Sequence, residues 1–203
     1  METLSIGGIF VISKKRIKEI FEELEVITYG HFLFTSGRHG DTYMQCAKLL
    51  KHPDYTREIV EPIVDRFKGD KIDIVIGPAI GGIILAYEFA RQLGVQNFFA
   101  ERENNVMTLR RGFRIPKGAR VLVVEDVITT GGSVREVIDI VEREEGELVG
   151  VAVLVDRTGG QVDFGTKFVT ALSEELVSYS PKDCPLCREG RLPLEKPGSK
   201  KFA

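Results

Sequence analysis

The 203-residue sequence has no tryptophan, only three cysteines and no long apolar run. No apolar stretch approaches the ~20 residues that a membrane-spanning helix requires, so no membrane is expected as a partner. Residues 1–12 contain no basic segment followed by a long apolar stretch, and no export signal is expected. These absences predict a cytoplasmic protein.

An excess of charge of one sign is also missing. The chain has 28 basic and 30 acidic side chains and a net charge of −2. A large basic face is therefore not expected, and nucleic acid is disfavoured as the main partner. Any phosphate that the protein binds should belong to a small molecule.

The cysteines are an odd number in a chain without an export signal, so a disulfide framework is not expected. Cys184 and Cys187 form a Cys-x-x-Cys pair, but a structural zinc site needs four ligands. The other candidate ligands lie far away in the sequence: Cys46, His31, His39 and His52. We therefore interpret the pair as a turn with free thiols, in a tail that lies on the surface from Pro181 onward.

What the sequence does contain is the composition of a folded domain, with 43% apolar and 29% charged residues. We expect one domain over residues 1–203, to which residues 1–50 add a helix and a hairpin. Ile17, Ile20, Phe21 and Leu24 fall on one stripe of a helix over residues 14–25, which Ser13 caps.

Two further N-terminal elements are expected. The aromatic-rich runs around the turn at residues 36–40 predict an irregular hairpin. A second helix is expected over residues 55–67, where Pro62 should kink or divide it.

From residue 72 onward, short β-branched runs alternate with longer amphipathic segments. We expect strands at 72–76, 97–101, 120–124, 148–155 and 168–172, and helices at 83–93 and 133–144. Strands that are buried on both faces and joined by helices indicate an α/β fold with a doubly wound, mainly parallel sheet. In such sheets ligands bind beyond the carboxyl ends of the strands.

The strongest chemical signal is the segment VLVVEDVITTGGSV at residues 121–134. Four apolar residues predict a buried strand, and Glu125 and Asp126 place two carboxylates at its end. A loop rich in threonine and glycine follows, and unpaired amides at the start of the next helix suit a phosphate dianion. The carboxylates suit the vicinal hydroxyls of a ribose instead. The segment therefore predicts a site for ribose 5-phosphate, unless the hydroxyls only cap a helix and the carboxylates are only solvated.

This segment resembles the binding motif of the type I phosphoribosyltransferases for 5-phosphoribosyl-1-diphosphate (PRPP). The resemblance implies that Asp126 is catalytic and that PRPP binds to Glu125, Asp126, Val127, Ile128, Thr129, Thr130, Gly131, Gly132 and Ser133. The loop at residues 77–82, Gly-Pro-Ala-Ile-Gly-Gly, resembles the family's pyrophosphate loop, although tight packing between a strand and a helix also explains its glycines.

Residues 101–112 match the place of the family's mobile catalytic loop, which closes over pyrophosphate. The loop has no lysine or histidine, and the resemblance implies that Arg102 is the catalytic residue there. A solvated surface loop is the alternative interpretation. The family also implies a homodimer in which this loop reaches the neighbouring subunit's site.

Two features resemble the orotate-specific members of the family. The segment GHFLFTSGRHGDTYMQC, residues 30–46, resembles the hood over the base, with His31 and His39 as hood residues. Thr129 and Arg157 match base-side positions, and the alternative for Arg157 is an ion pair with Asp156 or with another surface acid. The resemblance implies transfer of ribose 5-phosphate from PRPP to orotate, with Mg²⁺ carried mainly by PRPP and no metal ligand from the protein. Another base, or a non-catalytic regulator that senses PRPP or a nucleotide, remains open.

Overall fold

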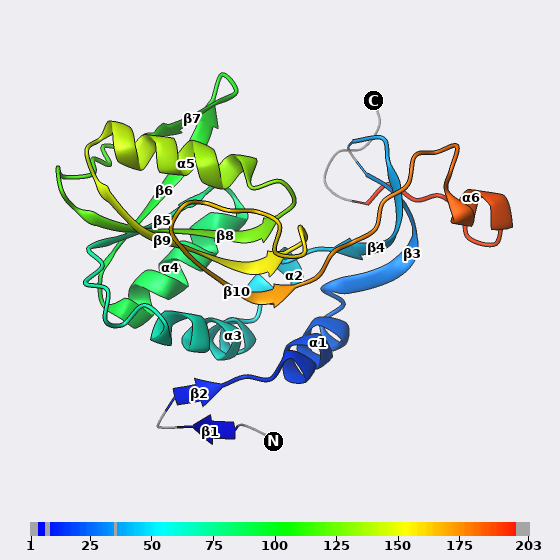
Figure 1. Cartoon of the computed structure of the whole chain (residues 1–203), viewed down its shortest axis with the longest axis horizontal. Coiled ribbons are helices and arrows are strands. Elements are labelled where there is room, and N and C mark those ends of the chain that lie inside the picture. Colours follow the sequence, from blue (N-terminus) through cyan, green and yellow to red (C-terminus); the bar gives the residue numbers. More distant parts are fainter. Residues whose placement is uncertain (1–3, 7–8, 35, 198–203) are drawn as a thin grey trace.

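A computed structural model of the chain describes residues 4–6, 9–34 and 36–197. Its centre is a six-stranded sheet with the strand order β10-β9-β8-β5-β6-β7 (Figure 1). Neighbouring strands run parallel except β7, which is antiparallel to β6. The strands are β5 (Ile74–Pro78), β6 (Gln96–Glu103), β7 (Val106–Leu109), β8 (Arg120–Ile128), β9 (Glu147–Asp156) and β10 (Lys167–Ser173). The expected doubly wound, mainly parallel sheet is confirmed.

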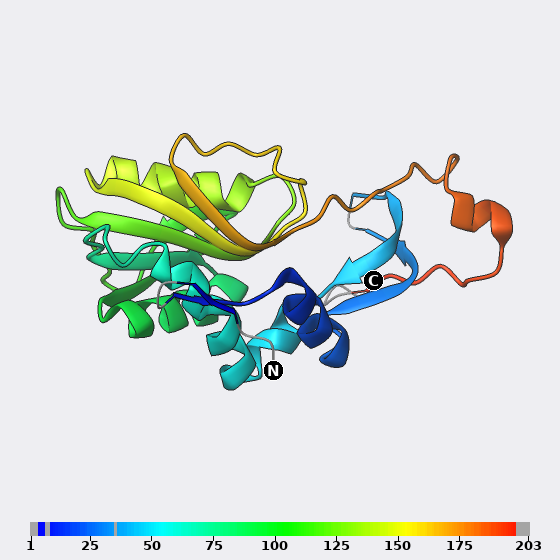
Figure 2. The ribbon, with the colours of Figure 1, turned by 60° about the horizontal axis from the view of Figure 1, so that its bottom comes forward.

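Helices cover both faces of this sheet (Figure 2). α3 (Pro53–Asp65) and α4 (Gly81–Leu93) cover one face and α5 (Gly132–Arg143) covers the other, while α1 (Lys14–Glu23) lies against β10 and α2 (Ala47–Leu50) packs on α3 and α4. Successive side chains of a strand point to opposite faces, so β8 contributes to two cores. Leu122 and Val124 pack in the cluster that includes α3 and α4, whereas Val121 and Val123 pack in the cluster that includes α5. This burial explains why residues 121–124 of β8 form an unbroken apolar run.

The N-terminal helix forms as expected. The hydroxyl of Ser13 accepts a hydrogen bond from the Arg16 amide at 3.1 Å, and Ile17, Ile20 and Phe21 are buried. The prediction for Pro62 was wrong in part, because α3 continues through it as one helix. A proline removes only one backbone hydrogen bond, and the burial of Ile59, Ile63 and Val64 around it stabilises the helix.

The stretch at residues 101–112 was expected to be a loop, and most of it is a β-hairpin. β6 continues to Glu103, β7 begins at Val106, and Arg102 pairs with Met107 in register. Asn104 and Asn105 form the two-residue turn with φ values of 51° and 66°. Asparagine tolerates this left-handed conformation, which a tight hairpin turn requires at both positions.

A second hairpin projects away from the sheet and consists of β3 (Ile27–Leu33) and β4 (His39–Met44) (Figures 1 and 2). We call β3, β4 and their turn the hood hairpin; Thr35, in this turn, lies outside the described residues. A register shift between Tyr29 and Phe32 makes it irregular, as predicted. The C-terminal segment returns past this hairpin and carries α6 (Pro185–Glu189).

The remaining strands, β1 (Leu4–Ile6) and β2 (Ile9–Val11), form a separate antiparallel pair. No helix in the described part of the chain combines the length and the apolar character that a membrane span needs.

Candidate active site

The candidate site lies where the chain direction across the sheet reverses. β5 and β8 are neighbours, but the chain leaves β5 toward β6 on one side and leaves β8 toward β9 on the other. The loops that follow the two strands therefore separate and leave a crevice at their carboxyl ends. The loop at residues 77–82 and the loop at residues 125–133 both lie at this edge.

The two carboxylates at the end of β8 are partly shielded from solvent. Glu125 is only 8% exposed, and its Oε1 accepts a hydrogen bond from the Asp126 amide at 3.1 Å. Burial raises the pKa of Glu125, and the neighbouring charge of Asp126 raises it further. Burial also raises the pKa of Asp126, although a hydrogen bond from the Val127 amide opposes this effect. Such a pair gains stability from hydroxyl donors or a cation that replaces the lost water.

The Asp126 carboxylate lies against the loop after β5. A Cβ atom added to Gly81 would lie 2.2 Å from Asp126 Oδ2, which is closer than real atoms approach. A Cβ on Gly77 would lie 2.5 Å from the carbonyl oxygen of Gly82. Close packing therefore explains Gly77 and Gly82, whereas Gly81 makes room for the carboxylate.

The loop after Asp126 forms a small pocket of about 70 Å³ at the start of α5. Gly131 is the N-cap residue, with a φ of 77° that favours glycine, and no side chain caps the helix. The Gly132 amide donates a long hydrogen bond to Thr130 Oγ1 at 3.4 Å, and the other amides of the first turn are the candidate anion donors at this pocket. The pocket is lined by Glu125, Val127, Ile128, Thr129, Thr130, Gly131, Gly132, Ser133 and Val134.

Arg157 follows β9 at the same edge and forms no ion pair with Asp156 or with another acid among the described residues, whereas the alternative interpretation would require one. The Asp156 carboxylate instead accepts hydrogen bonds from Thr158, Gly160 and Ser173. The half-buried Arg157 has an Nε atom without a hydrogen-bond partner among the described residues. Burial lowers the pKa of Arg157, so the side chain is short of an anionic partner.

The base-side residues meet across one pocket. Ile128 pairs with Asp156 in register, which places Thr129 and Arg157 side by side beyond the paired strands. Both line a pocket of about 440 Å³ that Thr130, Arg135 and Thr158 also line. The guanidinium of Arg157 lies 5.5 Å from the ring centre of Phe34, a hood residue, so the hood hairpin reaches this pocket.

Arg102 is not joined to this constellation by any contact within the described residues. It lies on β6, and its guanidinium donates hydrogen bonds to Glu136 of α5 and to the carbonyl of Asn105. Both partners of the ion pair with Glu136 are about 40% exposed, at 44% and 40%. An exposed pair of this kind contributes only about 0 to 1 kcal/mol and opens easily.

The interpretation of Cys184 and Cys187 as a simple surface turn was wrong. Cys184 is fully buried, and both thiols lie beside the imidazoles of His31 and His39. Distance along the sequence did not mean distance in space, because the C-terminal segment returns to the hood hairpin. Only Cys46 lies near the candidate active site, where its thiol donates to the Asp126 carbonyl at 3.7 Å.

A larger cavity of about 630 Å³ lies at the opposite, amino edge of the sheet. Asp73 and Lys117 are the only charged residues that line it. It lacks the paired carboxylates and the open helix start, so the smaller pockets at the carboxyl edge form the better candidate site.

Paired carboxylates and a glycine-rich helix start at the reversal point of a parallel sheet are an arrangement that suits a phosphorylated sugar. Residues 46–186 match the family of the phosphoribosyl transferase domain, and the chain belongs to this family. Solved structures agree on the fold. Orotate phosphoribosyltransferase from Aeropyrum pernix is 24% identical, with a TM-score of 0.67 over 77% of this chain and 93% of that chain. Adenine phosphoribosyltransferase from Rhodothermus marinus is 25% identical, with a TM-score of 0.63 over 77% and 99%.

Two relatives that are more similar in sequence are both orotate phosphoribosyltransferases. The orotate phosphoribosyltransferase of Caldanaerobacter subterraneus subsp. tengcongensis is 57% identical over 94% of this chain and all of the relative. That of Pelotomaculum thermopropionicum is 55% identical over the same shares.

Proposed function

We propose that the protein transfers the ribose 5-phosphate group of PRPP to orotate, which yields orotidine 5′-monophosphate and pyrophosphate. Solved structures of both orotate and adenine enzymes share the fold, so the fold alone does not select the base. The observation that carries the choice is the unpartnered Nε of Arg157 beside Thr129, because orotate presents a carboxylate and carbonyl oxygens that need donors. The relatives with more than half of their residues in common support the same base.

Different residues along the crevice bind different parts of the two substrates. Glu125 and Asp126 accept hydrogen bonds from the ribose hydroxyls, and the amides and hydroxyls of residues 129–133 hold the 5′-phosphate. Thr129 and Arg157 bind orotate, whose ring nitrogen is already an anionic nucleophile. The remaining barrier is charge separation at the sugar, so positioning and charge stabilisation are the main contributions of the protein.

Mg²⁺ is the cofactor that the reaction implies. The oxygen donors nearest to the bound sugar are those of Glu125 and Asp126, and their raised pKa values fit a site that gains from a cation. PRPP itself would supply most of the metal ligands. The chemistry that a bound Mg²⁺ would supply is neutralisation of the charge on the departing pyrophosphate.

We further propose a homodimer in which Arg102 assists pyrophosphate in the partner's site. Ile80, Ile84 and Tyr87 are exposed by 81%, 47% and 59% and follow one another at helical spacing along α4. Such an apolar stripe on the surface is typical of a contact between subunits. Residues 1–50 contribute the hood over the base in the single domain that we propose for residues 1–203.

A steady-state assay tests this function. We expect the absorbance of orotate to fall when the protein is mixed with PRPP, orotate and Mg²⁺, with one pyrophosphate released for each orotate consumed. Adenine, hypoxanthine and uracil serve as competing bases. Turnover of a purine but not of orotate would assign the protein to another base, and absence of turnover with tight PRPP binding would indicate a regulator.

A further inference from the structure

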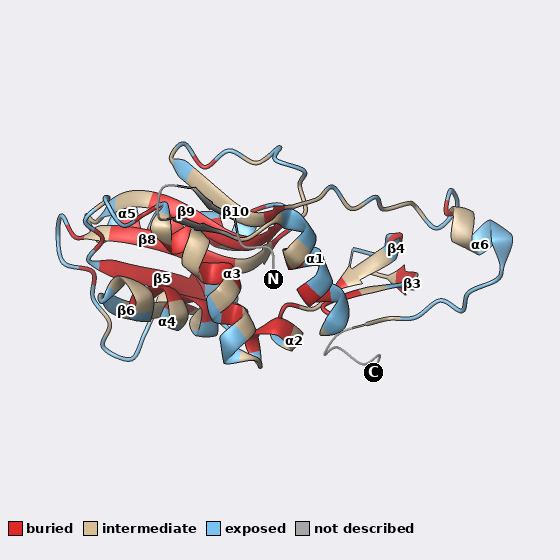
Figure 3. Ribbon diagram, turned by 90° about the horizontal axis from the view of Figure 1, so that it is seen from below, coloured by how far each residue is buried: buried red, intermediate tan, exposed pale blue. Residues whose placement is uncertain are grey.

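The far end of the hood hairpin has little apolar core. The two described core clusters include Ile27 and Met44 at its base but no residue between them. Figure 3 shows only short buried stretches in this hairpin. Phe32 is buried there, but the other buried residues include His31, His39 and Cys184, which are polar or metal-binding types. A small unit without a core needs another cross-link, such as a disulfide or a metal ion.

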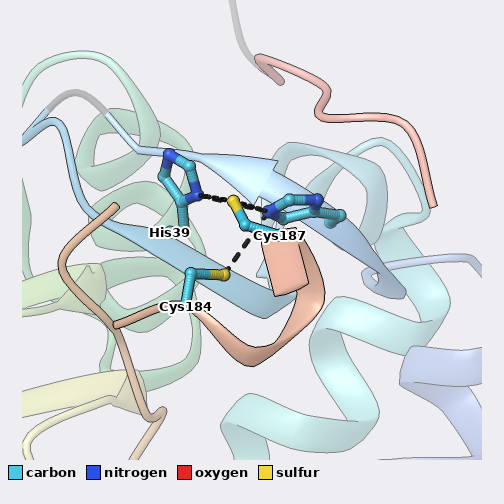
Figure 4. Close-up of side chains that lie close together, drawn as sticks. His39, Cys184 and Cys187 are labelled. Atoms are coloured by element: carbon cyan, nitrogen blue, oxygen red, sulfur yellow. Dashed lines mark hydrogen bonds between the residues drawn. The ribbon is translucent and has the colours of Figure 1, made fainter. Parts of the chain in front are cut away.

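The four candidate side chains come from three separate segments and meet at one point. His31 lies on β3, His39 begins β4, and Cys184 and Cys187 lie at the start and within the first turn of α6 (Figure 4). One nitrogen or sulfur atom from each of the four lies within 4.8 Å of the others. Figure 4 shows His39, Cys184 and Cys187 directed toward one another.

Hydrogen bonds alone do not account for these contacts. His31 Nε2 lies 3.2 Å from His39 Nδ1 and 3.5 Å from the sulfur atoms of both Cys184 and Cys187. An imidazole nitrogen has either one N–H or one lone pair in the plane of the ring, so it makes one good hydrogen bond. Three neighbours around one nitrogen instead fit a common centre that all four atoms face.

The spacings match the edges of a tetrahedron around zinc. Bond lengths of about 2.1 Å to nitrogen and about 2.3 Å to sulfur imply edges of about 3.4 Å between nitrogens and about 3.6 Å between nitrogen and sulfur. The nitrogen to nitrogen distance is 3.2 Å. The distances from His31 Nε2 to the two sulfur atoms are both 3.5 Å, and the distance from His39 Nδ1 to Cys187 Sγ is 3.2 Å.

The surroundings orient the ligands. His31 Nδ1 lies 3.3 Å from the carbonyl oxygen of Leu192. Because a carbonyl oxygen only accepts, Nδ1–H donates this hydrogen bond, and the lone pair of Nε2 is left for a metal. The C-terminal segment adds backbone hydrogen bonds on both edges of the hairpin, between His39 and Tyr179 and between Glu195 and His31. The cluster therefore lies inside a loop of chain that closes on the hood.

We propose that His31, His39, Cys184 and Cys187 bind one Zn²⁺ ion, which fastens the C-terminal segment to the hood hairpin. Two thiolates and two imidazoles in a tetrahedral array suit zinc best among the common metals. The two thiols lose their protons on binding, so their charges balance that of the ion and the imidazoles remain neutral. With all four positions taken by the protein, the site is structural and separate from the Mg²⁺ that the reaction uses.

Metal analysis of the untagged, reduced full chain tests this assignment. After gel filtration, inductively coupled plasma mass spectrometry should find about one zinc ion per chain in the wild type. The double variant C184S/C187S should lose more than about nine tenths of it, because two of four ligands are gone. The matched control is Cys46→Ala, which removes the third cysteine and should keep the zinc of the wild type. Because metal content is measured without substrate, the result is independent of the proposed reaction.

Cobalt substitution in the wild type tests the coordination of the site without relying on the double variant, which could fail to fold. Titration of the metal-free wild type with Co²⁺ should produce the visible bands of a tetrahedral ion and a near-ultraviolet band from thiolate to cobalt, and Zn²⁺ should abolish both. Octahedral cobalt spectra, zinc retained in the double variant, a different metal such as iron at equal stoichiometry, or a Cys184–Cys187 disulfide in the protein as isolated would each overturn the proposal.

Discussion

At the scale of single residues, Arg157 has a buried N–H donor that lacks an acceptor among the described residues. Its guanidinium lies over Phe34, its Nε is unpaired among the described residues, and the nearest acid along the chain, Asp156, is satisfied by other donors. A buried donor without an acceptor costs about 1 to 3 kcal/mol, which an anionic ligand recovers on binding.

Replacement of Arg157 should therefore act on the base and not on the sugar. We expect Arg157→Ala to weaken orotate binding by about one to two powers of ten, which corresponds to that cost. PRPP binding, measured by calorimetry with Mg²⁺, should hardly change. Arg157→Lys keeps the charge without the planar fork and should recover only part of the affinity. Equal weakening of orotate and PRPP would make Arg157 a structural residue.

The buried carboxylate of Glu125 should make stability depend on pH. Its pKa is raised in the folded protein, so the folded state holds a proton that the unfolded chain releases. The contribution of Glu125 to stability is then largest below the unfolded pKa of about 4.3 and falls, by at most about 1.4 kcal/mol per pH unit, as pH rises toward the folded pKa.

Glu125→Gln removes this titration, and the variant should gain melting temperature over the wild type as pH rises from about 4.5 to about 8. Each kcal/mol corresponds to about 2 to 4 °C for a chain of this size. Glu142→Gln, at an exposed position of α5, should show no such trend. A constant difference across this range would contradict the burial effect. Differential scanning calorimetry without ligands measures both variants.

At the scale of elements, the two loops at the carboxyl edge are in close contact. Gly81, the first residue of α4, lies directly against the Asp126 carboxylate. The start of α4 and the end of β8 are far apart in sequence, and only a glycine allows this approach. The close contact couples the loop after β5 to the carboxylate that we assign to the ribose.

Gly81→Ala should displace either the carboxylate or the loop and lower kcat/KM by about ten-fold or more, since small misplacements of positioning groups are costly. Gly69→Ala is the matched control, because a Cβ there meets no atom within 4 Å. We expect the control to keep the wild-type rate in the orotate assay. A Gly81→Ala variant with unchanged kcat/KM would show that the loop adapts, and the coupling would then have no catalytic role.

At the scale of the whole molecule, Arg102 lies outside the constellation that its own chain builds, and its side chain is engaged with Glu136. The exposed stripe on α4 provides a surface through which a second copy could bring its own hairpin to the site. The proposed homodimer thus explains how a residue on β6 contributes without a contact in its own chain.

Mixing two inactive variants tests the shared site. Arg102→Ala chains and Asp126→Ala chains should each lose most activity, and a heterodimer of the two should regain one complete site. With random exchange, about half of the dimers are mixed, so about a quarter of the wild-type activity should return. Light scattering must first establish a dimer, and mass spectrometry of differently tagged chains must show exchange. No recovery after proven exchange would mean that Arg102 acts within its own chain or not at all.

Much of the fold was predictable from the sequence, because the spacing of apolar residues along a segment indicates whether it forms a strand or a helix. The five runs at 72–76, 97–101, 120–124, 148–155 and 168–172 all lie in or overlap strands of the central sheet. The pattern is clearest for β5, β8 and β9, where burial on both faces favours continuous apolar residues. The segment at residues 121–134 also identified the site, because a strand end, two acids and a glycine-rich helix start are contiguous. The site residues named from it line the crevice, and their roles stay predictions.

The tertiary structure alone decided what depends on contacts between distant segments. The sequence placed His31 and His39 about 150 residues before Cys184 and Cys187 and offered no reason to join them. They meet because the C-terminal segment returns along both edges of the hood hairpin. This return is held by hydrogen bonds between backbone groups, which leave no pattern of side chains in the sequence. Arg157 is a mixed case. The Asp156 carboxylate accepts hydrogen bonds from Thr158 and Gly160, which are its neighbours in the sequence, and from Ser173 of β10, which only the tertiary structure brings close. Arg157 is thereby left without this acid as a partner.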